Sequence, residues 1–127
     1  MNGAKRGKIS TKPKPKRGDI WLIRFPFTDL TSAKVRPDLI LAVHGEDIVV
    51  IGIFSRLPIG ELRETWVPIK EDHSEYFRIG LKKTSVLKAE KIAVVHESVL
   101  QRSLGNLPQD IMEQVKKAVK KALLMTD

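Results

Sequence analysis

The side chains with the clearest chemical potential are arginines and hydroxyls that stand at the ends of apolar runs. Arg36 comes just before the apolar run 38–43, whereas Ser55 and Arg56 follow the apolar run 48–54. Guanidinium groups bind phosphate through two parallel hydrogen bonds and stay charged at pH 7. Hydroxyls and backbone N–H groups can complete such a cradle. This combination predicts a site for a phosphodiester that is built without a metal ion.

The order of these residues along the chain predicts that they meet at one rim. The segment His-Gly-Glu-Asp at 44–47 has the length of a hairpin turn, and pairing across it brings Arg36 opposite Ser55. The loops 26–34 and 56–64 would overhang the same rim. They add three further polar groups, which are Thr28, Thr31 and Lys34.

A structural role for Arg36 is the alternative reading of the same position. The guanidinium could cap loose carbonyl groups or pair with Asp29 or Asp38. A residue before proline is also restricted to extended conformations, so the position can simply mark the start of a strand. The residues alone leave the functional and the structural reading open.

Other catalytic chemistries have no specific support. The chain has no cysteine, which excludes disulfides, thiolate zinc sites and cysteine nucleophiles. The histidines, His44, His73 and His96, lack metal-ligand spacing, and the acidic pairs at 46–47 and 71–72 are typical of solvated turns. We therefore expect neither a metal site nor a cofactor.

The elements that must position these residues are mostly short strands. Apolar or alternating runs predict strands at 19–25, 38–43, 48–54, 65–69, 84–88 and 91–95. The segment 97–105 favours one helical turn, and an amphipathic helix follows Pro108. The apolar stripe of that helix comprises Ile111, Val115, Ala118, Val119 and Ala122. The sum is a mainly β fold, in which a small bent sheet or partly open barrel packs against one helix.

The positive charge of the chain is concentrated near its start. The net charge is +8, but residues 1–17 hold seven Lys or Arg and no acid, which leaves 16 of the 23 bases against 15 acids. The Lys-Pro alternation at 12–16 predicts a disordered basic tail over 1–17, with a phosphate-binding arm as the alternative. We expect one folded domain over 18–127. No apolar run approaches the ~20 residues that cross a bilayer, so we expect a cytoplasmic protein.

Four stretches of the sequence together resemble one known family. They are RGDIWLIRFPFTDL (17–30), KVRPDLIL (34–41), IGIFSR (51–56) and GLKKTSVLKAEKIAVV (80–95). They resemble the toxins of the MazF/PemK family, which are the ribonuclease halves of type II toxin–antitoxin pairs. The likeness extends over roughly residues 17–125. The Arg-Gly-Asp opening followed by Arg-Pro before a second apolar strand is its most specific part.

The resemblance implies a fold, an activity and partners. The fold would be an SH3-like barrel of the CcdB/PemK type, with five to seven short strands and a C-terminal helix, acting as a homodimer. The activity would be metal-independent cleavage of single-stranded RNA through attack by the 2′-OH, which leaves a 2′,3′-cyclic phosphate and a 5′-OH. A cognate antitoxin would cover the RNA groove with a flexible acidic segment. The family's arginine before proline falls on Arg36.

The chain departs from the family at the end of the third strand. Members commonly carry two hydroxyls there, whereas this chain reads Phe54-Ser55-Arg56. If the missing hydroxyl orients the 2′-OH, Ser55 must replace it. We therefore predict Arg36 and Ser55 as catalytic residues, with Arg36 as a stabiliser of charge because an arginine is a poor base. The alternative function is a catalytically weak relative that binds a protein or nucleic-acid partner through the same rim.

Five residues are predicted to bind RNA around this centre. They are Phe27, Thr28, Thr31, Lys34 and Arg56. Phe27 and Trp66 could stack on unpaired bases, a contact worth about 1–3 kcal/mol per base. For Trp66 a position in the core or in a dimer interface is the favoured alternative.

Overall fold

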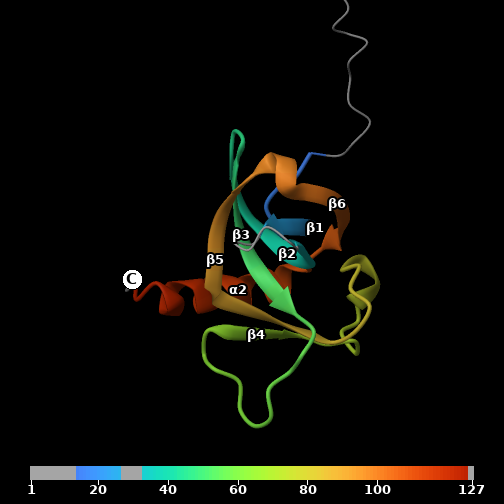
Figure 1. Ribbon diagram of the computed structural model, residues 1–127. Helices are drawn as coiled ribbons and strands as arrows, with labels where there is room; N and C mark the ends of the chain where they lie inside the picture. The colour runs from blue at the N-terminus through green and yellow to red at the C-terminus, as the bar shows by residue number, and fades with distance from the viewer. Residues whose placement is uncertain (1–13, 27–32, 126–127) are drawn as a thin grey trace, which may run out of the picture.

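The structure, a computed structural model, describes residues 14–26 and 33–125. Six antiparallel strands form one sheet in the order β4-β5-β3-β2-β1-β6, and helix α2 follows the last strand in the chain (Figure 1). The strands are β1 (Asp19–Pro26), β2 (Ala33–His44), β3 (Asp47–Phe54), β4 (Trp66–Ile69), β5 (Ser85–His96) and β6 (Leu100–Asn106), the 3-10 turns are η1 (Tyr76–Arg78) and η2 (Glu97–Val99), and α2 spans Gln109–Ala122. The expected mainly β fold with a C-terminal helix is confirmed.

The first three strands follow the first three apolar runs and pair as neighbours. β2 begins at Ala33, well before the start predicted at residue 38. Arg36 therefore lies within the strand instead of ahead of it, and it pairs with Ile23 of β1. This difference matters for the site, because the pairing with β1 fixes the backbone of Arg36.

A β-bulge midway along β2 shifts the hairpin register by one residue. Between the turn and the bulge, β2 and β3 pair as expected, whereas beyond the bulge Asp38 pairs with Gly52. A bulge adds one residue to one strand only, so every later pair moves by one position. Continued along the strands, this register sets Arg36 opposite Phe54. The expected pairing of Arg36 with Ser55 is wrong by one residue for this reason.

The later strands differ from the prediction in two places. The segments 84–88 and 91–95 belong to one long strand, β5, which is visibly bent in Figure 1. The segment 100–106 forms the edge strand β6 against β1, and only η2 is helical in the segment 97–105. β6 was missed because its sequence Leu-Gln-Arg-Ser-Leu-Gly-Asn does not alternate between apolar and polar residues.

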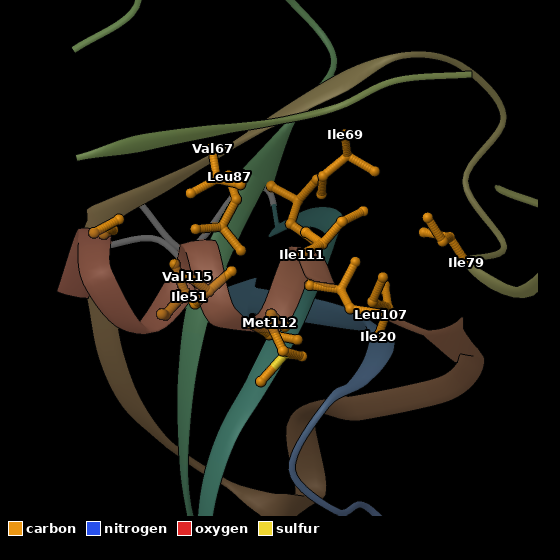
Figure 2. Packing of buried hydrophobic residues seen from close by; sticks show 14 residues of the cluster. Ile20, Ile51, Val67, Ile69, Ile79, Leu87, Leu107, Ile111, Met112 and Val115 are labelled. Atoms are coloured by element: carbon orange, nitrogen blue, oxygen red, sulfur yellow. The ribbon is translucent and has the colours of Figure 1, made fainter. Parts of the chain in front are cut away.

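Helix α2 supplies one wall of the larger buried cluster. Ile111, Val115 and Ala118 are buried as the stripe predicts, and Met112 is buried beside them. Figure 2 shows Ile111 and Val115 of the helix on the side of Val67 and Ile69 of β4 and Leu87 of β5. The acidic first turn and the lysines of the last turn complement the helix dipole. The helix therefore packs on the end of the sheet that carries β4.

A second, smaller cluster lies on the other side of the β1–β3 sheet. It comprises Trp21, Ile23, Ile40, Ile48 and Val50. Neighbouring residues of one strand point to opposite faces, so Ile20 and Leu39 fall in the α2 cluster. Both faces of these strands are buried, which explains why their sequences read as nearly continuous apolar runs.

Some expectations fall wholly or partly outside the described residues. Phe27, Thr28 and Thr31 lie there, as does the tail through residue 13. Within the described part of the tail, Lys16 donates hydrogen bonds to Asp19 and Arg17 donates one to the carbonyl oxygen of Leu41. Among the described residues, no helix is both long and apolar enough to cross a membrane.

Candidate nucleic-acid interface

A groove of about 750 Å³ opens where the ends of β2, β3, β4 and β5 meet. We call it the Arg36 groove. Its described lining residues are Lys34, Val35, Arg36, Pro37, Ile53, Phe54, Ser55, Arg56, Leu57, Pro58, Trp66, Ser85 and Lys88. Four of these lining side chains are cationic, and the described lining includes no carboxylate and no imidazole. A groove with this charge attracts a polyanion.

The Arg36 guanidinium is held by aromatic rings on two strands. Its Cζ lies 4.4 Å from the centroid of the Phe25 ring and 4.8 Å from that of the Phe54 ring. A cation this close to a ring face is attracted by the ring quadrupole, by about 0.5–1 kcal/mol when exposed and more when desolvated. The Arg36 side chain keeps 25% of its surface exposed. It is thus restrained and still accessible from the groove.

Cations and rings continue from Phe54 towards the edge of the sheet. The ammonium of Lys88 lies 4.7 Å from the Phe54 ring centroid and 4.5 Å from the Trp66 ring centroid. The Cζ atom of Arg63 lies 5.0 Å from the Trp66 ring centroid. These contacts join residues from β3, β5 and β4. The groove wall therefore presents positive charges interleaved with aromatic surfaces, which suits a single-stranded nucleic acid.

Glu90 of β5 fixes the indole of Trp66 from behind. Its carboxylate accepts hydrogen bonds from the Trp66 Nε1–H at 2.7 Å, from the Thr65 hydroxyl at 2.7 Å and from Arg63 at 3.2 Å. Desolvation raises the pKa of this carboxyl, but the hydrogen bonds from Trp66 and Thr65 and the charge of Arg63 outweigh it and hold the pKa below its usual value. Trp66 belongs to neither buried cluster of the described residues and lines the groove instead.

Gly52 makes room for the contact between Arg36 and Phe54. A Cβ atom at this position would lie 2.9 Å from two carbons of the Phe54 ring and 3.4 Å from Nη2 of Arg36. Contacts of 2.9 Å are shorter than packed side chains allow, so any larger residue would displace the ring. The missing side chain of Gly52 is thus part of how the site is built.

Asp38 contacts Arg36 from the interior of the protein. Its Oδ1 accepts a hydrogen bond from the Arg36 Nε–H at 3.2 Å, and the side chain is only 1% exposed. Burial raises the pKa of Asp38 to about 7, even though the charge and the hydrogen bond of Arg36 act in the opposite direction. The structural alternative for Arg36, a pairing with Asp38, is therefore present together with its exposure to the groove.

The predicted site residues within the described part of the chain come together. Arg36, Ser55, Arg56 and Lys34 all line the Arg36 groove. Sequence reasoning missed Lys88, because the residues at 84–88 do not indicate which other strands lie beside its side chain. The histidines lie elsewhere: His73 pairs with Asp110, and His96 accepts the Ser98 N–H at the start of η2. Among the described residues, no group of three or more His, Cys, Asp or Glu could hold a metal ion.

Comparison with known protein families identifies the family of the chain. Residues 16–123 match the family described as the PemK-like, MazF-like toxin of type II toxin–antitoxin systems. The match spans most of the chain, and the chain therefore belongs to this family. No curated protein matches the sequence significantly.

Solved structures share the fold at low sequence identity. An endoribonuclease from a mycobacterial species superposes with a TM-score of 0.68 at 20% identity, covering 93% of this chain and 99% of that one. The same kind of protein in complex with its cognate antitoxin gives 0.68 at 21% identity, covering 90% and 99%. A MazE–MazF structure from Deinococcus radiodurans gives 0.69 at 18% identity, covering 88% and 97%. These likenesses confirm the fold.

Proposed function

We propose that this protein is the toxin of a type II toxin–antitoxin system and acts as an endoribonuclease on single-stranded RNA. Its membership of the PemK-like, MazF-like toxin family supports the toxin role. The endoribonucleases among the structures of the same fold support the activity. The observation that carries the proposal is the Arg36 groove, in which an accessible, restrained guanidinium lies between aromatic rings and three further cations.

The reaction we propose is in-line attack of a ribose 2′-oxygen on the adjacent phosphorus. The 2′-oxygen loses its proton, the bond from phosphorus to the 5′-oxygen breaks, and the departing 5′-oxygen gains a proton, which leaves a 2′,3′-cyclic phosphate and a 5′-OH. Negative charge grows on the non-bridging oxygens, and the Nη groups of Arg36 stabilise it, with Arg56 beside the same groove. Ser55 is the hydroxyl that would orient the 2′-OH. These roles need no metal ion.

The proposed partners follow from the family and from the charge of the groove. The cognate antitoxin would place a flexible acidic segment over the cationic side chains of the groove and so compete with RNA. An endoribonuclease of this fold has been solved in complex with its cognate antitoxin, which supports an antitoxin as the partner. We propose a homodimer as the working unit and the cytoplasm as its location.

The experiment that tests the activity is cleavage of a long mixed-sequence RNA in the presence of EDTA. We expect discrete fragments whose 5′ ends accept phosphate from a kinase, because each carries a free hydroxyl. Arg36→Ala should slow cleavage by about 10²- to 10³-fold, the usual loss for one preorganised donor. Arg102→Ala is the matched control, since Arg102 is exposed on β6 and is not among the residues that line the groove. Equal rates for both variants would remove Arg36 from the mechanism.

A second candidate function follows from the position of Phe54. This residue replaces a hydroxyl that the family commonly carries, and its ring packs between Arg36 and Lys88. A groove built in this way can bind RNA or a protein without cutting RNA. Saturable binding of the same RNA with no cleavage over a wide range of protein concentration would favour this weakly catalytic binder over the nuclease.

A further inference from the structure

The carboxyl group of Asp38 lies directly behind the Arg36 groove. One of its oxygens accepts the Arg36 Nε–H, and the other oxygen, Oδ2, is buried and has no hydrogen-bond partner among the described residues. A buried carboxylate with one partner is costly, and replacing a buried ion pair by apolar residues is often neutral or stabilising. Stability therefore gives little reason for an acid at this position, and its contact with Arg36 points to a role in the site.

The hydrogen bond to Asp38 engages Nε of Arg36 and leaves both Nη groups for a phosphate. A guanidinium has five N–H donors, and the bond to Asp38 uses the one on Nε. The rings of Phe25 and Phe54 lie within 5 Å of Cζ. The four N–H groups on the two Nη atoms are not used by Asp38. Donors that are fixed before the substrate arrives stabilise developing charge without reorganisation.

We propose that Asp38 is a positioning residue that orients the Arg36 guanidinium so that its Nη groups face the scissile phosphate, and that RNA cleavage therefore depends on whether the Asp38 carboxyl carries a charge. The inference rests on the proposed ribonuclease function. Asp38 is not itself a catalytic residue, because it is buried and is not among the residues that line the groove.

The protonation of Asp38 supplies the pH dependence. Burial raises the pKa of this carboxyl to about 7, so the ion pair with Arg36 forms fully only on the alkaline side of that value. On the acidic side the carboxyl is neutral, so the Coulomb attraction between the carboxylate and the Arg36 guanidinium is lost. The partnerless Oδ2 can take the proton without breaking the bond to Arg36.

Both strand partners of Asp38 are uncharged. On β3 it pairs with Gly52, and on β1 it pairs with Trp21, neither of which titrates. The indole of Trp21 donates a hydrogen bond to Asp19. Lys88 of β5 also lines the groove, where its ammonium contacts the Phe54 ring. Arg36 is the charged group that acts directly on Asp38.

Asp38→Asn tests this role, because asparagine keeps the shape and the acceptor but loses the charge. Single-turnover cleavage rates of the wild type and the variant should be compared from pH 5.5 to pH 8.5. We expect their ratio to be close to one at the acidic end and to reach roughly tenfold at the alkaline end, where only the wild type keeps the attraction between a carboxylate and Arg36. The intrinsic ionisation of the 2′-OH cancels in this ratio. The Kd for uncleavable RNA should not rise, because the variant removes a negative charge.

Asp19→Asn is the matched control. Asp19 is also a buried acid on a neighbouring strand, and it holds Lys16 and Trp21 and not Arg36. The ratio of the wild-type rate to the Asp19→Asn rate should be the same at every pH. A ratio for Asp38→Asn that is equally flat, or that grows towards acidic pH, would overturn the proposal.

A second readout separates this inference from the proposed function. In the wild type, the Nε–H resonance of Arg36 and the carboxyl-carbon resonance of Asp38 should shift with pH at the same midpoint, near 7. In Asp38→Asn the Arg36 resonance should stay constant through that range. If the wild type cuts no RNA, the ribonuclease function is wrong, and the resonance still decides the coupling. An Arg36 signal that ignores the titration of Asp38 would refute it.

Discussion

The Arg36 guanidinium lies 4.8 Å above the ring of Phe54, where a hydroxyl was expected to be its neighbour on β3. This contact arises from the one-residue shift at the β2 bulge and from the space that Gly52 leaves. Ser55 remains in the same groove but follows the end of the strand. The β3 neighbour of Arg36 is thus an aromatic ring in place of the expected hydroxyl.

Phe54→Leu should impair cleavage while the fold remains intact. Leucine keeps an apolar side chain but removes the ring that attracts Arg36 and Lys88. A lost cation–π contact of about 0.5–2 kcal/mol predicts a rate that is lower by roughly two- to thirty-fold. Single-turnover kinetics will measure it, with Phe77→Leu as the control, since Phe77 is an exposed ring on η1 outside the groove. An unchanged rate would show that the ring does not restrain Arg36 in the active state.

Trp66→Ala should weaken the binding of single-stranded RNA. The indole is anchored by Glu90 and lines the groove, so it is a fixed platform for one base. A stacked base contributes about 1–3 kcal/mol, which corresponds to a Kd raised by roughly 5- to 150-fold. Fluorescence anisotropy with uncleavable RNA will measure it. Duplex RNA of the same sequence serves as the control ligand, because its bases are already stacked; an equal loss for both ligands would argue against stacking.

Lys88→Gln should reduce the salt dependence of RNA binding. Each phosphate contact to a single strand contributes about 0.7 to the slope of log Kobs against log salt concentration. Removing the Lys88 charge should therefore lower the magnitude of the slope by about that amount. Lys116→Gln provides the comparison, because Lys116 lies on α2 outside the Arg36 groove and should leave the slope unchanged. Two equal slopes would mean that RNA does not reach Lys88.

Asp38→Asn should be more stable than the wild type at alkaline pH. Because the pKa of Asp38 is about 7 in the folded protein and ordinarily 3.8, the folded state keeps a proton that the unfolded state loses between those values. The free energy of unfolding therefore falls as pH rises from about 4 to about 7 and levels off above. One pKa unit corresponds to about 1.4 kcal/mol, so the loss is on the order of 4 kcal/mol.

Urea unfolding at pH 5 and pH 8 will measure this difference. Asp38→Asn lacks the titrating carboxyl, so its free energy of unfolding should change less than that of the wild type between the two pH values. The variant should therefore be the more stable of the two at pH 8. A wild type that gains stability relative to the variant as pH rises would contradict the raised pKa.

Much of the fold was accessible from the sequence because its signals are local. The apolar runs of β1 and β3 and the 3.6-residue stripe of α2 identify elements whose burial depends on residues close together in the chain. The same holds for the hairpin turn at 44–47. Arg36 was singled out by its position between a loop and an apolar run, and four of the predicted site residues do line one groove.

Tertiary structure alone decided how the site is assembled. The β2 bulge, which exchanges Ser55 for Phe54 beside Arg36, depends on pairing between strands and leaves no pattern in either of them. Lys88 and Trp66 reach the groove from β5 and β4, far along the chain, so only the order of strands in the sheet brings them there. The raised pKa of Asp38 likewise exists because the fold removes its carboxyl from water, a property of packing that no single residue type carries.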